Sequence, residues 1–161
     1  MEIERQFLVA AKPDYSKAIA CTDMEQGYLS FDPELRIRRS GERFSFTFKS
    51  GAGLVRREEE FAIAAADYEK LLPGICGVLL RKKRYCLPLS ERLIAEYDEY
   101  ENAFAGLAFV EVEFPSVEAA EAFVPPAWFG REITEDPRFS AALLAKDGRE
   151  ILTIVGLADR L

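Results

Sequence analysis

Charged side chains that recur at every second position are the feature that most limits how this chain of 161 residues can fold. The chain opens with Glu2 and Glu4, and a later segment repeats the same spacing with Arg36 and Arg38. Successive side chains of a β-strand point to opposite faces, so charges two residues apart share one face. The pattern therefore predicts strands that each have one charged face and one apolar face.

Eight segments show this alternation between turns or changes of spacing. The predicted strands span residues 1–9, 26–31, 35–38, 43–49, 55–63, 78–87, 93–100 and 109–114. Composition and capping residues predict helices over residues 64–72, 116–122 and 138–146, and a loop with a short helical turn over residues 10–22. We predict no secondary structure for residues 147–161. No repeat or linker divides the chain, so we expect a single domain over residues 1–161, mainly β with flanking helices (α+β).

The composition excludes several classes of protein. The net charge of −7 disfavours a nucleic-acid or membrane-surface binder, because both targets are polyanionic and reward a basic surface. No apolar run approaches the roughly 20 residues of a membrane span, and no signal peptide is visible, so we expect a cytoplasmic protein. The three cysteines form no C-x-x-C pair and are expected to be reduced thiols.

Histidine is absent from the sequence. This excludes a Ser-His-Asp or Cys-His arrangement and any zinc ion held by histidine. Chemistry near neutral pH must then rest on carboxylates, lysines, tyrosines or a metal ion. Oxygen ligands favour magnesium, manganese or calcium over zinc or copper.

The charged faces carry six cations and eight carboxylates. They are Arg36, Arg38, Lys49, Arg56, Lys82 and Arg84, with Glu2, Glu4, Glu58, Glu60, Glu96, Asp98, Glu111 and Glu113. The solvent face of an ordinary antiparallel sheet would also show alternating charge. Here, however, cations are grouped with cations and acids with acids, whereas a surface adapted for solubility mixes the signs. If such a sheet closed into a barrel with its apolar faces outward under helices, these charges would line the interior.

Such a lining suits a chain of phosphates together with a metal ion. Arginine forks bind phosphate oxygens through two hydrogen bonds, and lysines bind them as point charges. Carboxylates can hold divalent cations that bridge to phosphoryl oxygens and neutralise developing charge. A cavity lined by both kinds of group fits a metal-bound triphosphate better than a bare anion or a bare metal.

The order of these motifs resembles that of the CYTH family, the triphosphate tunnel metalloenzymes, which include class IV adenylate cyclases and thiamine triphosphatases. The opening Glu2-Ile3-Glu4 is similar to the E-x-E-x-K signature of the family. The remaining motifs follow in the family's order up to about Ala145, and the later segments 128–130 and 133–136 are similar to its short bacterial members.

This resemblance implies a closed eight-stranded antiparallel β-barrel tunnel with a charged interior. It implies that the six cations bind the triphosphate, and that the eight carboxylates hold Mg²⁺ or Mn²⁺ or orient the basic residues. The partner would be a triphosphate-containing small molecule or inorganic polyphosphate, with no nucleic acid and no membrane, and the chain is compatible with a homodimer.

Two positions depart from the family pattern. Gln6 stands where the signature has lysine, and an amide cannot accept a proton at neutral pH. The lysine of the family is a candidate for activating the attacking water, and in this chain Lys82 is the alternative group for that role. In the C-terminal helix, short relatives tend to carry Asn and Lys before a final Leu-Ala, where this chain has residues 140–145 as Ser-Ala-Ala-Leu-Leu-Ala.

Three functions are consistent with this sequence. The leading hypothesis is metal-dependent hydrolysis of inorganic triphosphate or a small organic triphosphate. A class IV-type adenylate cyclase would use the same lining, but it needs a base-recognition pocket that the sequence does not identify. The third is a triphosphate- or polyphosphate-binding protein that has lost turnover, which Gln6 favours.

Overall fold

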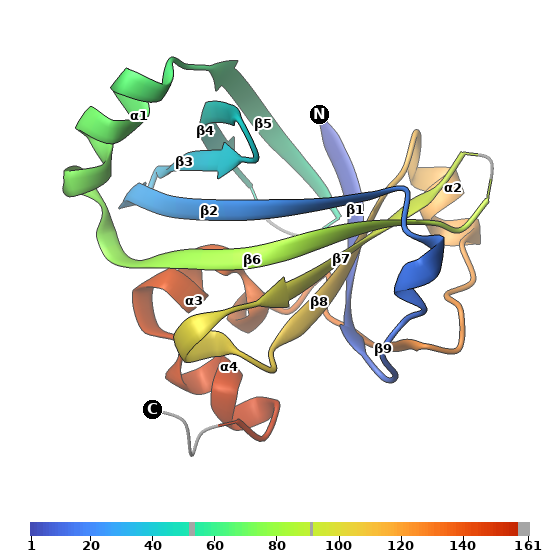
Figure 1. Ribbon diagram of the computed structural model, residues 1–161. Coiled ribbons are helices and arrows are strands. Elements are labelled where there is room, and N and C mark those ends of the chain that lie inside the picture. The colour runs from blue at the N-terminus through green and yellow to red at the C-terminus, as the bar shows by residue number, and fades with distance from the viewer. Residues whose placement is uncertain (52–53, 91, 158–161) are drawn as a thin grey trace.

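Eight antiparallel strands form a closed barrel in the computed structural model, which describes residues 1–51, 54–90 and 92–157 (Figure 1). The strands are β1 (Glu2–Val9), β2 (Ala20–Phe31), β3 (Glu34–Ser40), β4 (Arg43–Ser50), β5 (Val55–Ala62), β6 (Cys76–Pro88), β7 (Ile94–Tyr100) and β8 (Ala108–Glu113). Their order around the barrel is β5-β4-β3-β2-β6-β7-β8-β1, and β5 pairs with β1 to close it. A short ninth strand, β9 (Phe129–Glu132), lies beside β1.

The opening strand β1 provides the seam that closes the barrel. Its first residues pair with β5, with Glu2 opposite Arg56 and Ile3 opposite Val55. From Glu4 onward it pairs instead with β8. Because register fixes side-chain direction in a strand, this seam turns the alternate carboxylates of β1 into the barrel.

Four short helices cover the outside of the barrel. They are α1 (Ala65–Leu71), α2 (Val117–Ala122), α3 (Ala141–Asp147) and α4 (Arg149–Ile154), and 3-10 turns span Tyr15–Lys17, Leu72–Gly74, Asn102–Phe104 and Pro137–Phe139. Ser116 and Ser140 cap α2 and α3, where each hydroxyl accepts a hydrogen bond from a backbone N–H three residues later. None of the described helices combines the length and the apolar character needed to cross a membrane.

The apolar side chains form two clusters around the charged interior. One lies on the outer faces of β1, β7 and β8, where Phe7 and Val112 pack with α2 and β9. The other lies at one end of the barrel, where Leu80, Tyr100 and Phe109 continue the inward alternation of β6, β7 and β8. Residues of α3 and α4 pack against this inner layer, below the barrel in Figure 1. The charged interior therefore ends in an apolar floor.

The predicted fold is confirmed, and all eight predicted strands are present. Two boundaries were wrong by three residues or more, and the others differ by at most two. Residues 20–22 of the expected loop belong to β2, because they pair with β6 up to Ala20 opposite Cys86. The helix expected over residues 138–146 begins at Ala141, because Ser140 caps it after the separate turn Pro137–Phe139.

Two further elements had no prediction. Strand β9 hydrogen-bonds to β1, a pairing between distant segments that local alternation does not reveal. In the stretch 147–161, α4 buries Ile151 and Leu152 beneath the barrel, and residues 158–161 lie outside the described part of the chain.

Gly77 allows α3 to pack against the start of β6, and its replacement tests this contact. Its φ is +69°, and a Cβ there would lie 2.1 Å from the carbonyl oxygen of Ala145. Gly77→Ala should lower the free energy of unfolding by about 2–4 kcal/mol, through a left-handed backbone and an overpacked contact. Urea titration measures the loss. Gly156→Ala is the matched control, because Gly156 has φ +75° and nothing within 4 Å of a Cβ; equal losses in both variants would contradict the packing role.

Candidate functional site

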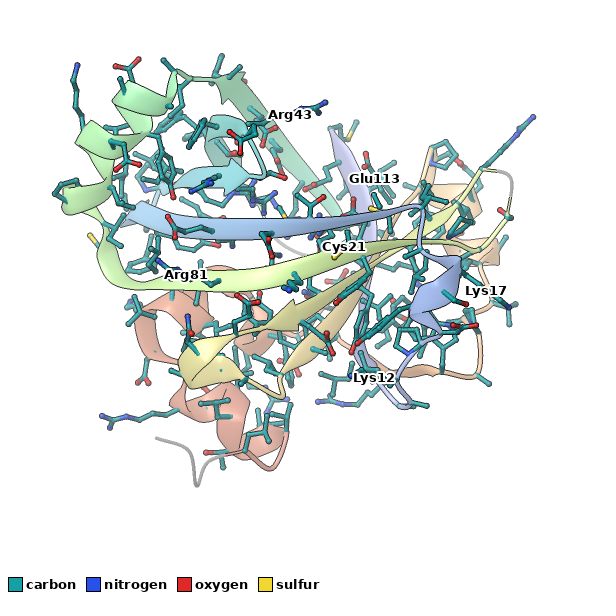
Figure 2. All side chains as sticks on the ribbon, in the orientation of Figure 1. Lys12, Lys17, Cys21, Arg43, Arg81 and Glu113 are labelled. Atoms are coloured by element: carbon teal, nitrogen blue, oxygen red, sulfur yellow. The ribbon has the colours of Figure 1, made fainter. Side chains whose placement is uncertain are left out.

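A polar cavity occupies the interior of the barrel, and all eight strands contribute side chains to it. Strands β4 and β7 contribute one each, and the others contribute two or three. Twelve of the fourteen predicted charged residues line it: Glu2, Glu4, Arg36, Arg38, Lys49, Arg56, Glu58, Lys82, Arg84, Glu96, Glu111 and Glu113. Gln6 lines it as well. Cations outside the predicted set, such as Lys12, Lys17, Arg43 and Arg81, lie exposed on the outside of the barrel (Figure 2). Alternation therefore separated the interior cations from the surface cations.

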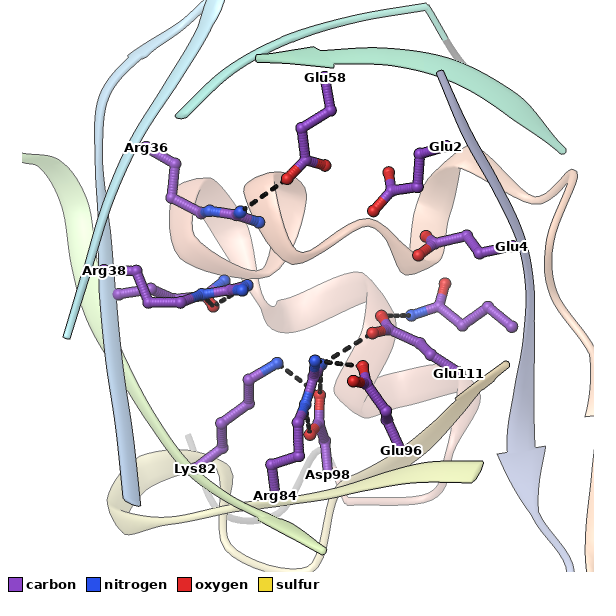
Figure 3. Close-up of polar contacts among 12 residues, drawn as sticks. Glu2, Glu4, Arg36, Arg38, Glu58, Lys82, Arg84, Glu96, Asp98 and Glu111 are labelled. Atoms are coloured by element: carbon purple, nitrogen blue, oxygen red, sulfur yellow. Dashed lines mark hydrogen bonds and ion pairs between the residues drawn. The ribbon is translucent and has the colours of Figure 1, made fainter. Parts of the chain in front are cut away.

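The cavity has two walls of opposite charge. Arg36 and Arg38 on β3 and Lys82 on β6 lie along one side, and Glu2 and Glu4 on β1 face them across the cavity (Figure 3). The separation follows from strand order, since only β2 lies between β3 and β6, while β1 lies on the opposite side of the ring. An elongated anion could contact the cationic wall while a cation contacts the acidic wall.

Asp98 holds the deepest network of charges. Its carboxylate accepts hydrogen bonds from Arg84 Nε at 2.7 Å and Nη2 at 2.8 Å, and it pairs with Lys82. Arg84 also binds Glu111 at 2.8 Å and pairs with Glu96. Lys82 and Asp98 are 3% and 1% exposed, so water contributes little to their solvation.

Burial and neighbouring charge shift the pKa values of this network in different directions. Burial would raise the pKa of Asp98, but Arg84 and Lys82 outweigh it and hold the pKa below its usual range. Burial lowers the pKa of Lys82 to about 8, with Asp98 opposing the shift and Arg84 adding to it. Burial thus brings the Lys82 ammonium closer to losing its proton near neutral pH.

A second network joins the seam of the barrel to β4 and β5. Lys49 Nζ lies 3.0 Å from Glu58 Oε2 and 3.3 Å from Glu2 Oε2, and Arg56 pairs with Glu2 and Glu4. Burial would raise the pKa of Glu58, but Lys49, the contact with Glu2 and the charge of Arg36 together outweigh it, and the pKa falls to about 2. Burial raises the pKa of Glu2, which also faces the Glu58 carboxylate.

The carboxylates of this second network have the donor chemistry of a magnesium or manganese site. Glu2 Oε2 and Glu58 Oε2 are buried and accept no hydrogen bond, although Lys49 Nζ lies 3.3 and 3.0 Å from them; a bound cation would share these oxygens with Lys49. No three acidic or thiol side chains converge on one point among the described residues. Mg²⁺ commonly takes one or two carboxylates and completes its shell with water and substrate phosphates, so these residues fit such an ion.

Asp98 and Glu60, both predicted metal ligands, do not line the cavity. Asp98 lies beneath Lys82 and Arg84, which together bind both of its carboxylate oxygens. Glu60 lies toward the rim, where it accepts a hydrogen bond from Thr47 at 3.1 Å and lies 3.7 Å from Arg36. Both side chains lie on the predicted inward faces, and their contacts with Lys82, Arg84 and Arg36 fit the orienting role that the resemblance allowed beside metal binding. Alternation defines the face of a strand but not the depth along it.

Three lining residues were missed. Gln26 and Tyr28 on β2 and Glu34 on β3 all face the cavity. Glu34 continues the alternation of Arg36 and Arg38 by one step, and Gln26 and Tyr28 alternate in the same way, so this signal was present in the sequence. Residues 140–142 at the start of α3 also reach the cavity, close to the departure from the family pattern noted above.

Comparison with known proteins defines the class to which this barrel belongs. No family model matches the chain. An inorganic triphosphatase from Nitrosomonas europaea is 42% identical over 147 residues, which cover 89% of this chain and 96% of that protein. An inorganic triphosphatase from Acetivibrio thermocellus is 32% identical and covers 91% of this chain and 94% of that protein. The chain belongs to the CYTH family of triphosphate tunnel metalloenzymes.

Solved structures agree with this assignment. The crystal structure of an inorganic triphosphatase superposes with a TM-score of 0.69 and 39% identity over 91% of this chain and 95% of that one. A candidate adenylyl cyclase from Hippeastrum with a dominant triphosphatase activity superposes with a TM-score of 0.61 over 75% of this chain and 83% of that one. At 16% identity the second comparison shows the shared fold alone.

Replacing Asp98 tests the deepest network. Asp98→Asn leaves Lys82 buried without its carboxylate and should lower the free energy of unfolding by about 3 kcal/mol at pH 7. Glu96→Gln is the control, because Glu96 is 41% exposed and its pair should contribute about 1 kcal/mol or less. Urea unfolding measures both.

Comparison of the unaltered protein with Asp98→Asn also gives a pH test. The folded-state pKa of Asp98 is below its unfolded value of about 3.9. Its contribution is therefore complete above that value and is lost as pH falls through the lower folded pKa. The stability difference between the unaltered protein and Asp98→Asn should shrink below about pH 4, and a constant difference down to pH 2 would contradict the assignment.

Proposed function

We propose that this protein hydrolyses inorganic triphosphate inside the tunnel with the help of a divalent metal ion. The observation that supports this most directly is the closed cavity with a cationic wall facing an acidic wall. Two relatives that are matched along almost their whole length carry the name inorganic triphosphatase. A small organic triphosphate is the alternative substrate.

The six tunnel cations are proposed to bind the phosphate chain. Arg36 and Arg38 can each offer two parallel N–H donors to phosphoryl oxygens, whereas Lys49 and Lys82 act as point charges. Arg84 would contribute mainly its charge, because most of its N–H donors are bound to Asp98, Glu96 and Glu111. Arg56 closes the seam beside Glu2 and would contact the end of the chain that lies nearest the metal site. Held in this way, the terminal phosphoryl group has its negative charge balanced before attack.

The acidic wall is proposed to hold Mg²⁺ or Mn²⁺. Glu2, Glu4 and Glu58 are the first candidates, because the buried Oε2 atoms of Glu2 and Glu58 accept no hydrogen bond; Glu96, Glu111 and Glu113 line the cavity beyond them. When bound, the ion would neutralise phosphoryl oxygens and polarise water. Asp98 and Glu60 are proposed instead to orient Lys82, Arg84 and Arg36.

Lys82 is the proposed proton acceptor. A neutral amine at Nζ could take a proton from the attacking water, and the pKa of about 8 makes this form accessible near neutral pH. Gln6 donates from Nε2 to Glu111 at 3.2 Å and would fix that carboxylate. The amide cannot replace the lysine of the family signature in proton transfer.

Two alternatives use the same cavity. An adenylate cyclase would need a pocket that recognises the base, and its support here is limited to the fold shared with distant structures. A binding protein without turnover is favoured only by Gln6. A homodimer, and the lack of nucleic-acid and membrane partners, remain predictions.

One set of assays separates these functions. The purified protein is incubated with inorganic triphosphate, ATP or thiamine triphosphate, each with Mg²⁺ or Mn²⁺, and phosphate release and products are followed. We expect phosphate release to be fastest from inorganic triphosphate and to stop with EDTA. Cyclic AMP as product would identify a cyclase, and binding without turnover in every mixture would refute the hydrolase.

Lys82→Arg tests the proton acceptor. The variant keeps a cation in the wall, but a guanidinium stays protonated at accessible pH. The kcat of the unaltered protein should rise as pH increases through about 8, where the neutral amine accumulates, and the variant should lose about 100-fold or more in kcat. Lys83→Arg on the exposed side of β6 is the control. Equal activity and equal pH profiles would restrict Lys82 to phosphate binding.

Gln6→Lys tests the altered signature position. The new ammonium would lie beside Glu111, where Gln6 Nε2 now donates, and should raise phosphate release by providing a second group that can exchange a proton. Gln6→Met controls for the loss of the amide alone. An unchanged rate in the lysine variant would indicate that Lys82 already activates water without assistance.

A further inference from the structure

Arg38 differs from the other five tunnel cations in what holds it. Each of those five pairs with at least one carboxylate: Arg36 with Glu58, Lys49 with Glu58, Arg56 with Glu4, Lys82 with Asp98 and Arg84 with Asp98. Within the described part of the chain, Arg38 has no ion pair. Its Nε and Nη2 both donate to the amide oxygen of Gln26, at 3.2 and 2.9 Å.

Gln26 can adopt only one orientation in this position. It is 1% exposed and lies opposite Arg38 in the pairing of β2 with β3. A guanidinium offers donors and no acceptor, so the amide oxygen must face Arg38. The amide nitrogen then faces the other way, where it donates to the Tyr28 hydroxyl at 3.2 Å. Both ends of the amide are therefore engaged.

The charge of Arg38 is left without a counter-charge in contact. Burial, together with repulsion from Arg36 and Arg84, lowers the pKa of Arg38 to about 10. A neutral amide satisfies hydrogen-bond donors without cancelling this charge, whereas a carboxylate would do both. Arg38 is half-buried, and a cation partly withdrawn from water among like charges is unfavourable until an anion reaches it. The surplus positive charge of the wall is thus concentrated at Arg38.

We propose that Gln26 is a positioning residue that fixes Arg38 without neutralising it and thereby reserves this guanidinium for a phosphoryl group of the substrate. The inference rests on the proposed function, because it assigns the anion to triphosphate. Gln26 does not contact reacting atoms in this scheme. Its effect reaches the substrate through Arg38, and through the Tyr28 hydroxyl on its other side.

Gln26→Glu tests the proposal with almost no change of shape. The carboxylate would pair with Arg38 and compete with phosphate, so the dissociation constant of inorganic triphosphate should rise about tenfold or more. KM should rise by a similar factor while kcat changes about twofold or less, as expected for an interaction made equally in ground and transition states. Gln26→Met removes the acceptor but leaves Arg38 charged, and should weaken binding by only about threefold.

The measurements are calorimetric titration with inorganic triphosphate, both with Mg²⁺ and with EDTA, and steady-state kinetics. Asn102→Asp is the matched control, since it converts an exposed amide to a carboxylate outside the tunnel and should leave affinity unchanged. Urea unfolding identifies any loss of folding. If Gln26 only packed the wall, Gln26→Met would weaken binding at least as much as Gln26→Glu, and that order would overturn the proposal.

The outcomes also separate this inference from the proposed function. Triphosphate binding without hydrolysis by the unaltered protein would refute the hydrolase, and the order of affinities in the variants would still decide the role of Gln26. Normal hydrolysis with unchanged affinity in Gln26→Glu would refute the role of Gln26 and leave the hydrolase intact. Absence of triphosphate binding in both conditions would overturn both.

Discussion

The burial of many like charges inside one closed barrel is the constraint on which the rest of the structure depends. An isolated buried charge costs several kcal/mol, so each tunnel cation needs a partner held at hydrogen-bond distance. The sheet supplies those partners through its register, which places Arg84 opposite Asp98 and Lys49 opposite Glu58. The same hydrogen-bonded ladder that closes the barrel therefore balances its interior charge.

The apolar floor determines how strongly these charges act. Tyr100 and Phe109 extend the inward faces of β7 and β8 beyond the charged positions and pack with residues of α3 and α4. Charges above such a layer interact in a medium of lower effective dielectric than water. This environment lowers the pKa of Lys82. It opposes the ionisation of Asp98, whose pKa is held low by the charges of Arg84 and Lys82. The helices at the end of the chain thus influence the chemistry of residues far from them in sequence.

Much of the site could be predicted from the alternation of charges, and the exceptions have a physical reason. The face of each charged residue was predicted correctly for the twelve that line the cavity. Asp98 and Glu60 share those faces but lie beneath or beside the cations that they hold. Gln26 and Tyr28 were missed because they are uncharged, although both face the cavity. A pattern of charge reveals direction, whereas depth and hydrogen bonding depend on neighbouring strands.

The sequence by itself determined the strands, their inward faces and the grouping of cations and acids, because a period of two residues is a local property of the chain. Only the tertiary structure decided that Glu2 meets Arg56 at the seam, that α3 and α4 cover an apolar floor, and that Arg38 faces an amide where other cations face carboxylates. Those features depend on register and closure between segments far apart in sequence. The alternation within a single strand carries no information about them.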